Sequence, residues 1–240
     1  QYIQAIRPAD RAAMDAARKR QAELAKPPGS LGALEDMSIR LAGITGQVCP
    51  KMGKCRVAVF AAENGVVDEG VSCAPRSVTL QQAINMTRRR TGMSAMAAAF
   101  GDDVAVVDVG IAGDVPDVDI LDRKVRRGTG NIAVEDAMTR PEALAAMAAG
   151  MEQAACARAD SITALGIGEM GIGNTSTSAA VLSALTGADI EVVTGRGGGL
   201  TDEGFARKKD VLRRALTRRA VDKDDVLDVL CAVGGLDIAA

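Results

Sequence analysis

Residues 161–185 have the sequence SITALGIGEMGIGNTSTSAAVLSAL, in which a short apolar run, a glycine-rich loop and a helical pattern follow one another. The apolar run 161–165 is typical of a strand that is buried on both faces. The Asn, Thr and Ser residues at 174–177 suit the first turn of a helix. This order predicts a strand–loop–helix unit, from which parallel sheets are built.

The same order recurs along the chain. Three further β-branched runs lead into loops of glycine and small polar residues: Arg56–Ala61 before AENGV, Val104–Val107 before DVGIAGD, and Ile190–Val193 before TGRGGG. Helical patterns are expected at Leu31–Thr45, Val78–Phe100 with an interruption at Gly92, Pro141–Arg158, Thr175–Leu185, Asp202–Leu216 and Asp224–Cys231. The alternation predicts an α/β fold, a Rossmann-like, three-layer parallel β-sheet with helices on both faces.

The N-terminal segment has a different character. Residues 8–25 form an Ala-rich, charged helical pattern, and the KPPG of 26–29 is a predicted hinge. We therefore expect residues 1–29 to be the N-terminal helical arm of a small helical subdomain, and residues 30–240 to form the α/β domain.

Composition excludes several classes of function. The 240 residues carry 29 Lys and Arg against 31 Asp and Glu, with one Tyr, three Phe and no Trp. The chain therefore has neither the basic surface nor the aromatic side chains of a nucleic-acid binder. It has no His, so acid–base chemistry falls to carboxylates, and no metal site is expected. Five scattered cysteines and the lack of a long apolar run predict a cytoplasmic protein without a membrane span.

The glycine-rich loops predict where the ligand binds, because ligands of parallel sheets lie outside the carboxyl ends of the strands. Residues 166–171 match GxGxxG, the pattern of a dinucleotide-binding domain, so an NAD(P)-dependent oxidoreductase is one alternative. The acidic residues that would hold the ribose, Asp189 and Glu191, stand at the beginning of the next predicted strand rather than at its end.

A single phosphate suits the same loop. Residues 168–175 resemble a Walker A loop in which Asn174 replaces the lysine, which argues against a nucleoside triphosphate. The remaining features, glycines that lead into a Thr/Ser helix start, can hold one phosphate on backbone N–H groups. The second loop, 194–201, precedes a helix that carries the cations of 207–209. A non-catalytic phosphonucleotide-binding module is a further alternative.

Several motifs together resemble one family. They are KPPGSLGALE (26–35), FAAENGVVDEGVS (60–72) followed by VTLQ, DVGI (108–111), GTGN and AMTR within 128–140, LGIGEMGIGNTSTSAA (165–180) and VTGRGGGLTDEGFARK (193–208). In this order they resemble the nicotinate-nucleotide:dimethylbenzimidazole phosphoribosyltransferase family. GEMGIGNTS is the most specific of them.

The resemblance implies an enzyme, a pentosyltransferase of cobalamin lower-ligand assembly. It would move 5-phosphoribose from nicotinate mononucleotide to a benzimidazole-type base, releasing nicotinate and needing no cofactor. Glu169 would face the reaction centre as a catalytic residue. The phosphoribose would be held by Gly171, Ile172, Gly173, Asn174, Thr175, Ser176, Gly195, Arg196, Gly197, Gly198 and Lys208. The acceptor base would lie beside Glu63, Asn64, Ser72 and Gln81.

The chain departs from the family pattern in two places. Glu63 and Asn64 stand where the family commonly has Asp-His, which changes the donors near the acceptor. The sequence ends at GGLDIAA, before the segment in which the family's catalytic glutamate is expected. We therefore expect the α/β phosphoribosyl-nucleotide-binding domain to be incomplete at its C-terminus, and the 240-residue chain to be a fragment with little activity. The family resemblance also implies a homodimer.

Overall fold

The chain consists of two compact units. The computed structural model describes residues 2–218 and 220–240, and the first unit ends at Gly53. This unit carries α1 (Tyr2–Ala5), α2 (Arg11–Glu23) and α3 (Ala33–Thr45), and buried alanines of α2 pack against Ala42 of α3. The sequence placed the boundary at residue 29, so α3 lies in a different unit from the one expected.

The second unit begins at Lys54 and holds a parallel sheet of strand order β3-β2-β1-β4. Its strands are β1 (Cys55–Ala62), β2 (Asp103–Gly110), β3 (Leu121–Asp122) and β4 (Ala164–Met170). A short 3-10 helix, η1 (Gly65–Glu69), follows β1. The other helices are α4 (Val78–Thr87), α5 (Gly92–Phe100), α6 (Arg140–Ala159), α7 (Asn174–Thr186), α8 (Ile190–Val193), α9 (Asp202–Arg218), α10 (Val226–Val233) and α11 (Leu236–Ala239).

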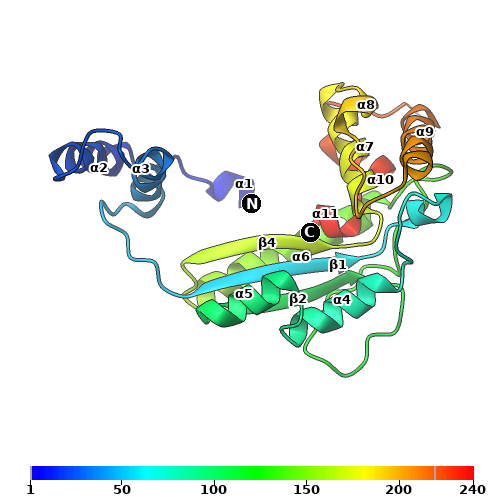
Figure 1. Ribbon diagram of the computed structural model, residues 1–240, viewed down its shortest axis with the longest axis horizontal. Coiled ribbons are helices and arrows are strands. Elements are labelled where there is room, and N and C mark those ends of the chain that lie inside the picture. The colour runs from blue at the N-terminus through cyan, green and yellow to red at the C-terminus, as the bar shows by residue number, and fades with distance from the viewer. Residues whose placement is uncertain (1, 219) are drawn as a thin grey trace. The chain divides into compact units, whose positions relative to one another are not determined.

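Helices cover both faces of this sheet, as the sequence predicts. Alternate residues of β1 enter two separate cores, because successive side chains of a strand point to opposite faces. Phe60 lies in a core with residues of α6, α7, α9, α10 and α11, whereas Val59 and Ala61 pack with Ala83 and Met86 of α4. Figure 1 shows α4 and α5 on one side of β1 and β2, with α6 on the other.

The segment Ile190–Val193 corrects the sequence prediction, because it forms a helical turn, α8, and not a strand. The Asp189 carboxylate caps this turn by accepting a hydrogen bond from the Glu191 N–H. Ile190 is buried but Val192 is 81% exposed, so the run is not covered on both faces. A β-branched run of four residues does not distinguish a buried strand from a helical turn. The loop 194–201 therefore follows a helical turn and not a strand of the sheet.

Local signals explain where the longer helices start. The Thr139 hydroxyl accepts a hydrogen bond from the Glu142 N–H while the Glu142 carboxylate accepts one from the Thr139 N–H, which is the capping box of α6. Thr91 and Ser94 form the equivalent pair at α5, so the pattern 78–100 divides into two helices. Within the described residues, no helix combines the length and apolar character that crossing a membrane requires.

Candidate functional site

Three loops at the carboxyl ends of β1, β2 and β4 lie together, because the strands are parallel neighbours. The Glu63 N–H donates to the Gly110 carbonyl (3.0 Å), which joins the β1 and β2 loops. The Asn64 N–H donates to the Ile172 carbonyl (3.4 Å), which joins the β1 and β4 loops. The predicted convergence of these loops is therefore observed.

The loop between β4 and α7 has no room for side chains at its glycines. A Cβ on Gly171 would lie 2.2 Å from Asp237 Oδ2 and 2.3 Å from the Ala62 carbonyl oxygen. Gly173 has φ +96°, a conformation that glycine adopts without strain. The Ile172 N–H donates to the Thr79 hydroxyl (3.0 Å), which fixes the loop on α4. The loop therefore holds the backbone N–H groups at the N-terminus of α7 in a fixed position.

Gly166 and Gly168, in contrast, do not form a loop. Both lie inside β4, where they pair with Val57 and Val59 of β1. The first two glycines of a dinucleotide fingerprint belong in a turn after the strand. The GxGxxG match at 166–171 is therefore incidental, and the dinucleotide alternative is wrong.

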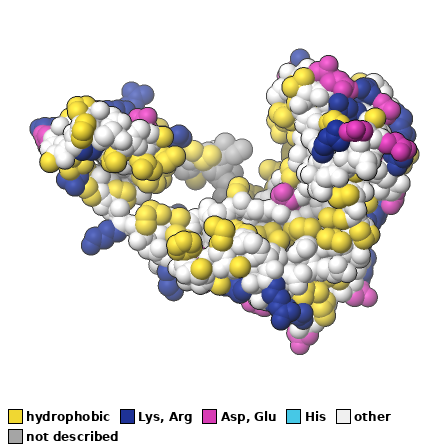
Figure 2. All heavy atoms as spheres, in the orientation of Figure 1, with side chains coloured by type: hydrophobic (Ala, Val, Ile, Leu, Met, Phe, Trp, Pro, Cys, Tyr) yellow, Lys and Arg dark blue, Asp and Glu magenta, His cyan; other side chains and the backbone are white. Residues whose placement is uncertain are grey.

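Lys208 joins the two glycine loops that the sequence singled out. It lies on α9 with 0% of its surface exposed, and its ammonium donates to Thr175 Oγ1 (2.8 Å) and to the Gly195 carbonyl (3.1 Å). Burial lowers the pKa of Lys208 to about 8. The neighbouring cations lie on the surface, where Figure 2 shows Lys, Arg, Asp and Glu side chains gathered over α8 and α9.

A small cavity lies between the two glycine loops. It has a volume of about 110 Å³, and its lining includes Ser72 and Arg196 together with Gly171, Ile172, Gly173, Asn174, Thr175, Gly197 and Gly198. Most residues predicted to hold the phosphoribose therefore share one cavity. Ser176, Gly195 and Lys208, which were also predicted to hold the phosphoribose, are not among the residues that line it. Ser176 Oγ and Thr194 Oγ1 are buried without a hydrogen-bond partner, next in the chain to Thr175 and Gly195, the two residues that Lys208 contacts. Buried polar groups without a partner are rare in folded proteins.

Glu169 lies at the end of β4 on a second cavity of about 250 Å³, with Phe60, Ile167, Gly168 and Asp237 among its lining residues. The side-chain amide of Asn174 donates a hydrogen bond to Glu169 Oε2. Desolvation raises the pKa of Glu169. Glu169, which the family resemblance places at the reaction centre, thus lines a cavity. Asp237, the second carboxylate of that cavity, was not predicted from the sequence.

The residues predicted to contact the acceptor base occupy different environments. Asn64 is fully buried, where its amide donates to Asp237 Oδ2 (3.4 Å) and its carbonyl accepts from the Thr177 hydroxyl (3.3 Å). Ser72 lines the cavity between the glycine loops, whereas Gln81 is exposed on α4 outside that cavity. The structure thus brings Ser72 and Asn64 to the phosphoribose loops, Asn64 through the bond from its N–H to the Ile172 carbonyl, and leaves Gln81 outside them.

Glu63 is also buried, and burial raises the pKa of its carboxyl group, while the Ala112 backbone and the Arg76 guanidinium act in the opposite direction. Its role toward an acceptor stays a prediction.

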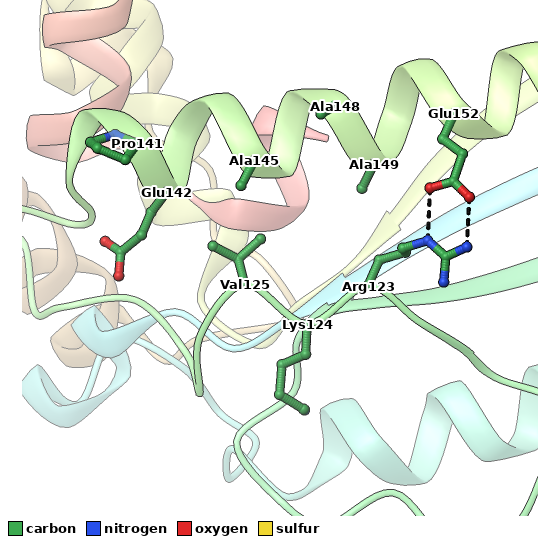
Figure 3. Close-up of a pocket in the computed structure, with 9 residues that line it drawn as sticks. All are labelled: Arg123, Lys124, Val125, Pro141, Glu142, Ala145, Ala148, Ala149 and Glu152. Carbon is green, nitrogen blue, oxygen red and sulfur yellow. Dashed lines mark hydrogen bonds and ion pairs between the residues drawn. The ribbon is translucent and has the colours of Figure 1, made fainter.

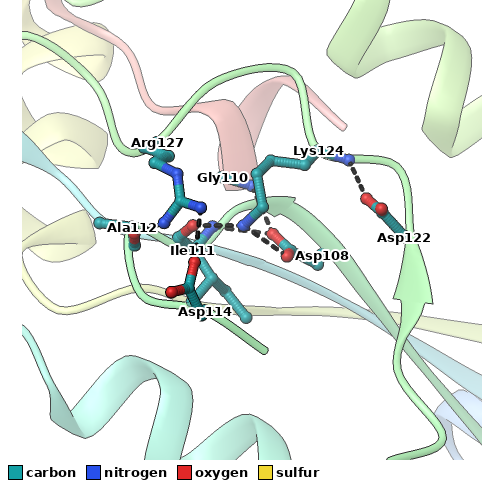
Figure 4. A network of polar contacts seen from close by, with 8 residues as sticks. All are labelled: Asp108, Gly110, Ile111, Ala112, Asp114, Asp122, Lys124 and Arg127. Atoms are coloured by element: carbon teal, nitrogen blue, oxygen red, sulfur yellow. Dashed lines mark hydrogen bonds and ion pairs between the residues drawn. The ribbon is translucent and has the colours of Figure 1, made fainter. Parts of the chain in front are cut away.

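Asp108, the predicted carboxylate after β2, has a structural environment (Figure 4). It accepts hydrogen bonds from the N–H groups of Gly110 (3.0 Å) and Ile111 (2.8 Å) and forms an ion pair with Lys124 (2.7 Å). The Lys124 ammonium also donates to the Ile111 carbonyl. The Lys124 contacts hold the end of β2 against the segment that follows β3. Asp108 therefore has a structural role at the end of β2.

A larger cavity lies elsewhere, between α6 and residues 123–125 (Figure 3). It measures about 640 Å³ and is lined by alanines of α6, with an Arg123–Glu152 ion pair at one end. None of the glycine-loop residues lines it, and its charged side chains are paired. We therefore assign the functional site to the two smaller cavities. No group of His, Cys, Asp and Glu side chains within residues 2–218 and 220–240 is arranged to hold a metal ion.

Comparison with known proteins agrees with this geometry. Residues 6–240 match a family described as Phosphoribosyltransferase, so the fold and the loops define a phosphoribosyl-transferring enzyme class. The chain is 46% identical to a nicotinate-nucleotide–dimethylbenzimidazole phosphoribosyltransferase of Desulforudis audaxviator over 99% of its own length and 68% of the relative's. It is 45% identical to the enzyme of that name from Geobacter sp. strain M21, over 98% and 67% of the two lengths.

The same family appears among solved structures. A crystal structure of CobT from Thermus thermophilus superposes with a TM-score of 0.90 at 43% identity, covering 95% of this chain and 68% of the other. This chain belongs to the nicotinate-nucleotide–dimethylbenzimidazole phosphoribosyltransferase family. It spans about two thirds of the length of these relatives.

Proposed function

We propose that this protein transfers 5-phosphoribose from nicotinate mononucleotide to a benzimidazole-type base, giving α-ribazole phosphate and nicotinate. The observation that carries the proposal is Lys208, a buried cation that hydrogen-bonds to both glycine loops around one cavity. The named relatives support the substrates, since their names specify a nicotinate nucleotide and dimethylbenzimidazole. The incidental GxGxxG match removes the support for an oxidoreductase.

The donor phosphate lies, in this proposal, at the N-terminus of α7. The first N–H groups of a helix lack partners within the helix, and its dipole favours an anion there. Lys208 supplies the positive charge, and the buried hydroxyls of Ser176 and Thr194 supply further donors. Backbone, cation and hydroxyls together suit one phosphate monoester.

Transfer then proceeds at C1′ of the ribose. A ring nitrogen of the acceptor bonds to C1′ while the C1′–N bond to nicotinate breaks, and that electron pair neutralises the pyridinium ring. The acceptor's other N–H then gives up its proton to water, which completes the balance of the step. Glu169 faces the positive charge that develops on the ribose, which a carboxylate in a partly dry cavity stabilises more strongly than water does. Holding both rings about one ribose contributes further, by proximity.

The test incubates the purified protein with nicotinate mononucleotide and 5,6-dimethylbenzimidazole, and follows nicotinate and α-ribazole phosphate by chromatography. Calorimetric titrations with nicotinate mononucleotide and with NAD accompany it. We expect mononucleotide binding, and slow nicotinate release that depends on the acceptor, because little activity is expected of the 240-residue chain. Mononucleotide binding without nicotinate release would favour the non-catalytic binding module. Tight NAD binding without mononucleotide binding would overturn the proposal.

We also propose that the protein is a cytoplasmic homodimer. Apolar side chains on the surface of α5 support the dimer, since Met96 is 64% and Phe100 78% exposed, and Leu144 on α6 is 49% exposed. A soluble nucleotide substrate and the scattered cysteines support the compartment. Light scattering at micromolar concentration should give twice the chain mass, and Phe100→Lys should lower it. A monomeric wild-type protein would contradict the dimer.

A further inference from the structure

Asp237 is a buried carboxylate that the mechanism above does not use. It lies on α11 with 3% of its surface exposed, and its Oδ1 accepts a hydrogen bond from the Ile238 N–H (3.0 Å). A Cβ on Gly171 would lie 2.2 Å from Oδ2, and one on Gly235 would lie 2.4 Å from Oδ1. Two glycines therefore make room for this carboxyl group beneath the β4–α7 loop.

Neutral groups also fix the side chain of Asp237. Asn64 donates to Oδ2 (3.4 Å) and is itself held by the Thr177 hydroxyl (3.3 Å). These residues come from the end of β1 and from the first turn of α7, the two elements that carry the predicted site. The chain Thr177–Asn64–Asp237 therefore links the phosphate-binding helix to the wall of the second cavity.

Glu169 shares that cavity with Asp237. Of the described groups, Glu169 is the one whose charge acts most strongly on Asp237, and neither carboxyl group forms an ion pair with a described Lys or Arg. Burial first, and then the charge of Glu169, raise the pKa of Asp237 to about 7. Two carboxyl groups in one partly dry site ionise one after the other, and the proton remains on the more buried of the two.

We propose that Asp237 is a positioning residue that retains the proton of the pair, so that of these two side chains Glu169 alone carries a negative charge. The inference rests on the proposed function, because the single charge is the one that faces the ribose. Glu169 is the partner suited to carry it, since it lies at the mouth of the cavity and accepts a hydrogen bond from Asn174. A second charge on Asp237 would repel the anionic donor.

The kinetic test compares the wild type with Asp237→Asn, in which an amide replaces a neutral carboxyl group of the same shape. Loss of the Asp237 proton near pH 7 should raise the wild-type KM for nicotinate mononucleotide about tenfold between pH 6 and pH 8, with little change in kcat. Asp237→Asn should lose this pH dependence, with a KM that changes less than twofold between pH 6 and pH 8. Asp210→Asn, on the exposed face of α9, is the matched control and should behave as wild type.

An infrared titration tests the pair without any transfer activity. The wild type should show the carbonyl band of a protonated carboxylic acid at pH 6 that disappears by pH 8, and Asp237→Asn should lack it. In Glu169→Gln the band should disappear at lower pH, because the neighbouring charge is gone. If this band is absent from the wild type, or unmoved in Glu169→Gln, the pairing is wrong even where Asp237→Asn fails to fold.

The two proposals fail separately. A protein that shows the band but releases no nicotinate contradicts the proposed function and leaves the pair standing. A protein that transfers phosphoribose while Asp237→Asn keeps the wild-type pH dependence of KM contradicts the role of Asp237.

Discussion

Replacing Lys208 by Met separates the stability of the fold from the binding of the donor. The pKa of Lys208 falls from 10.5 to about 8, so charging this side chain in the folded protein costs about 3 kcal/mol more than in water. The variant removes that penalty and also loses two hydrogen bonds, each worth about 0.5–1.5 kcal/mol. Thr175 and Gly195 are exposed and can bond to water instead. We expect Lys208→Met to be more stable at pH 7 by about 0–2 kcal/mol.

The pH dependence of the free energy of unfolding should also differ between the wild type and Lys208→Met. The folded protein binds its Lys208 proton less tightly than the unfolded chain does, so between pH 8 and 10.5 the unfolded chain carries more protons. The free energy of unfolding of the wild type should therefore rise across this window, and Lys208→Met should lack that rise. A bound phosphate pairs with the charged form of Lys208, so inorganic phosphate should stabilise the wild type against urea at pH 7 and leave the variant unchanged.

Donor affinity should change in the opposite direction. A hydrogen bond from a charged group is worth about 1.5–3 kcal/mol, so the dissociation constant of nicotinate mononucleotide should rise roughly 10- to 150-fold in Lys208→Met. Lys209→Met is the control for donor affinity, because that half-buried ammonium pairs with Glu191 (2.7 Å) and lies 4.3 Å from the centre of the Phe205 ring, and we expect donor affinity to be unchanged. Urea denaturation and titration calorimetry measure the two effects. A Lys208→Met protein that is clearly destabilised and binds the donor normally would refute this reasoning.

Three further substitutions test the loops. Gly171→Ala should destabilise the protein by roughly 1–3 kcal/mol in urea denaturation, because its Cβ would meet the Ala62 carbonyl, while Gly92→Ala, whose Cβ meets nothing within 4 Å, should not. Lys124→Met should cost about 3 kcal/mol by leaving Asp108 buried and unpaired, and a double-mutant cycle with Asp108→Asn should recover most of it. Glu169→Gln should lower kcat in the nicotinate-release assay with little change in donor affinity; an unaltered kcat would contradict its electrostatic role.

The sequence predicted those parts of the fold whose signals are local. The apolar runs of β1 and β2 are long enough to identify strands, and the Thr139 and Gly92 signals locate the helix boundaries of α6 and α5. The run 190–193 was misassigned because one capping contact from Asp189 decides between a strand and a helical turn. Strand β3 was missed since its two residues carry no periodic pattern.

Some residues of the candidate site could likewise be predicted from the sequence, and others could not. The proposed phosphate-binding residues of the first loop could be named because glycines and hydroxyls stand together in the sequence, whereas Lys208 was selected among the cations of 207–209 by the family resemblance. Asp237 was not predictable, because its contact with Asn64 joins residues 173 positions apart. Asn64 and Asp237 come together only because α11 packs against the residues that follow β1.

Lys208 and Asp237 also show why the site needs two cavities of opposite character. Each is an ionisable group that burial pushes toward its neutral form, and each lies against a glycine loop, Lys208 against the loop that leads to α9 and Asp237 against the loop that leads to α7. An anion bound at the phosphate loops would stabilise the charged form of Lys208, whereas a negative charge on Glu169 favours the neutral form of Asp237. In the proposed function, the donor presents its phosphate to the first cavity and its developing positive charge to the second. A protein with this arrangement is therefore least stable when empty, and donor binding should stabilise it by favouring the charged state of Lys208 that burial opposes.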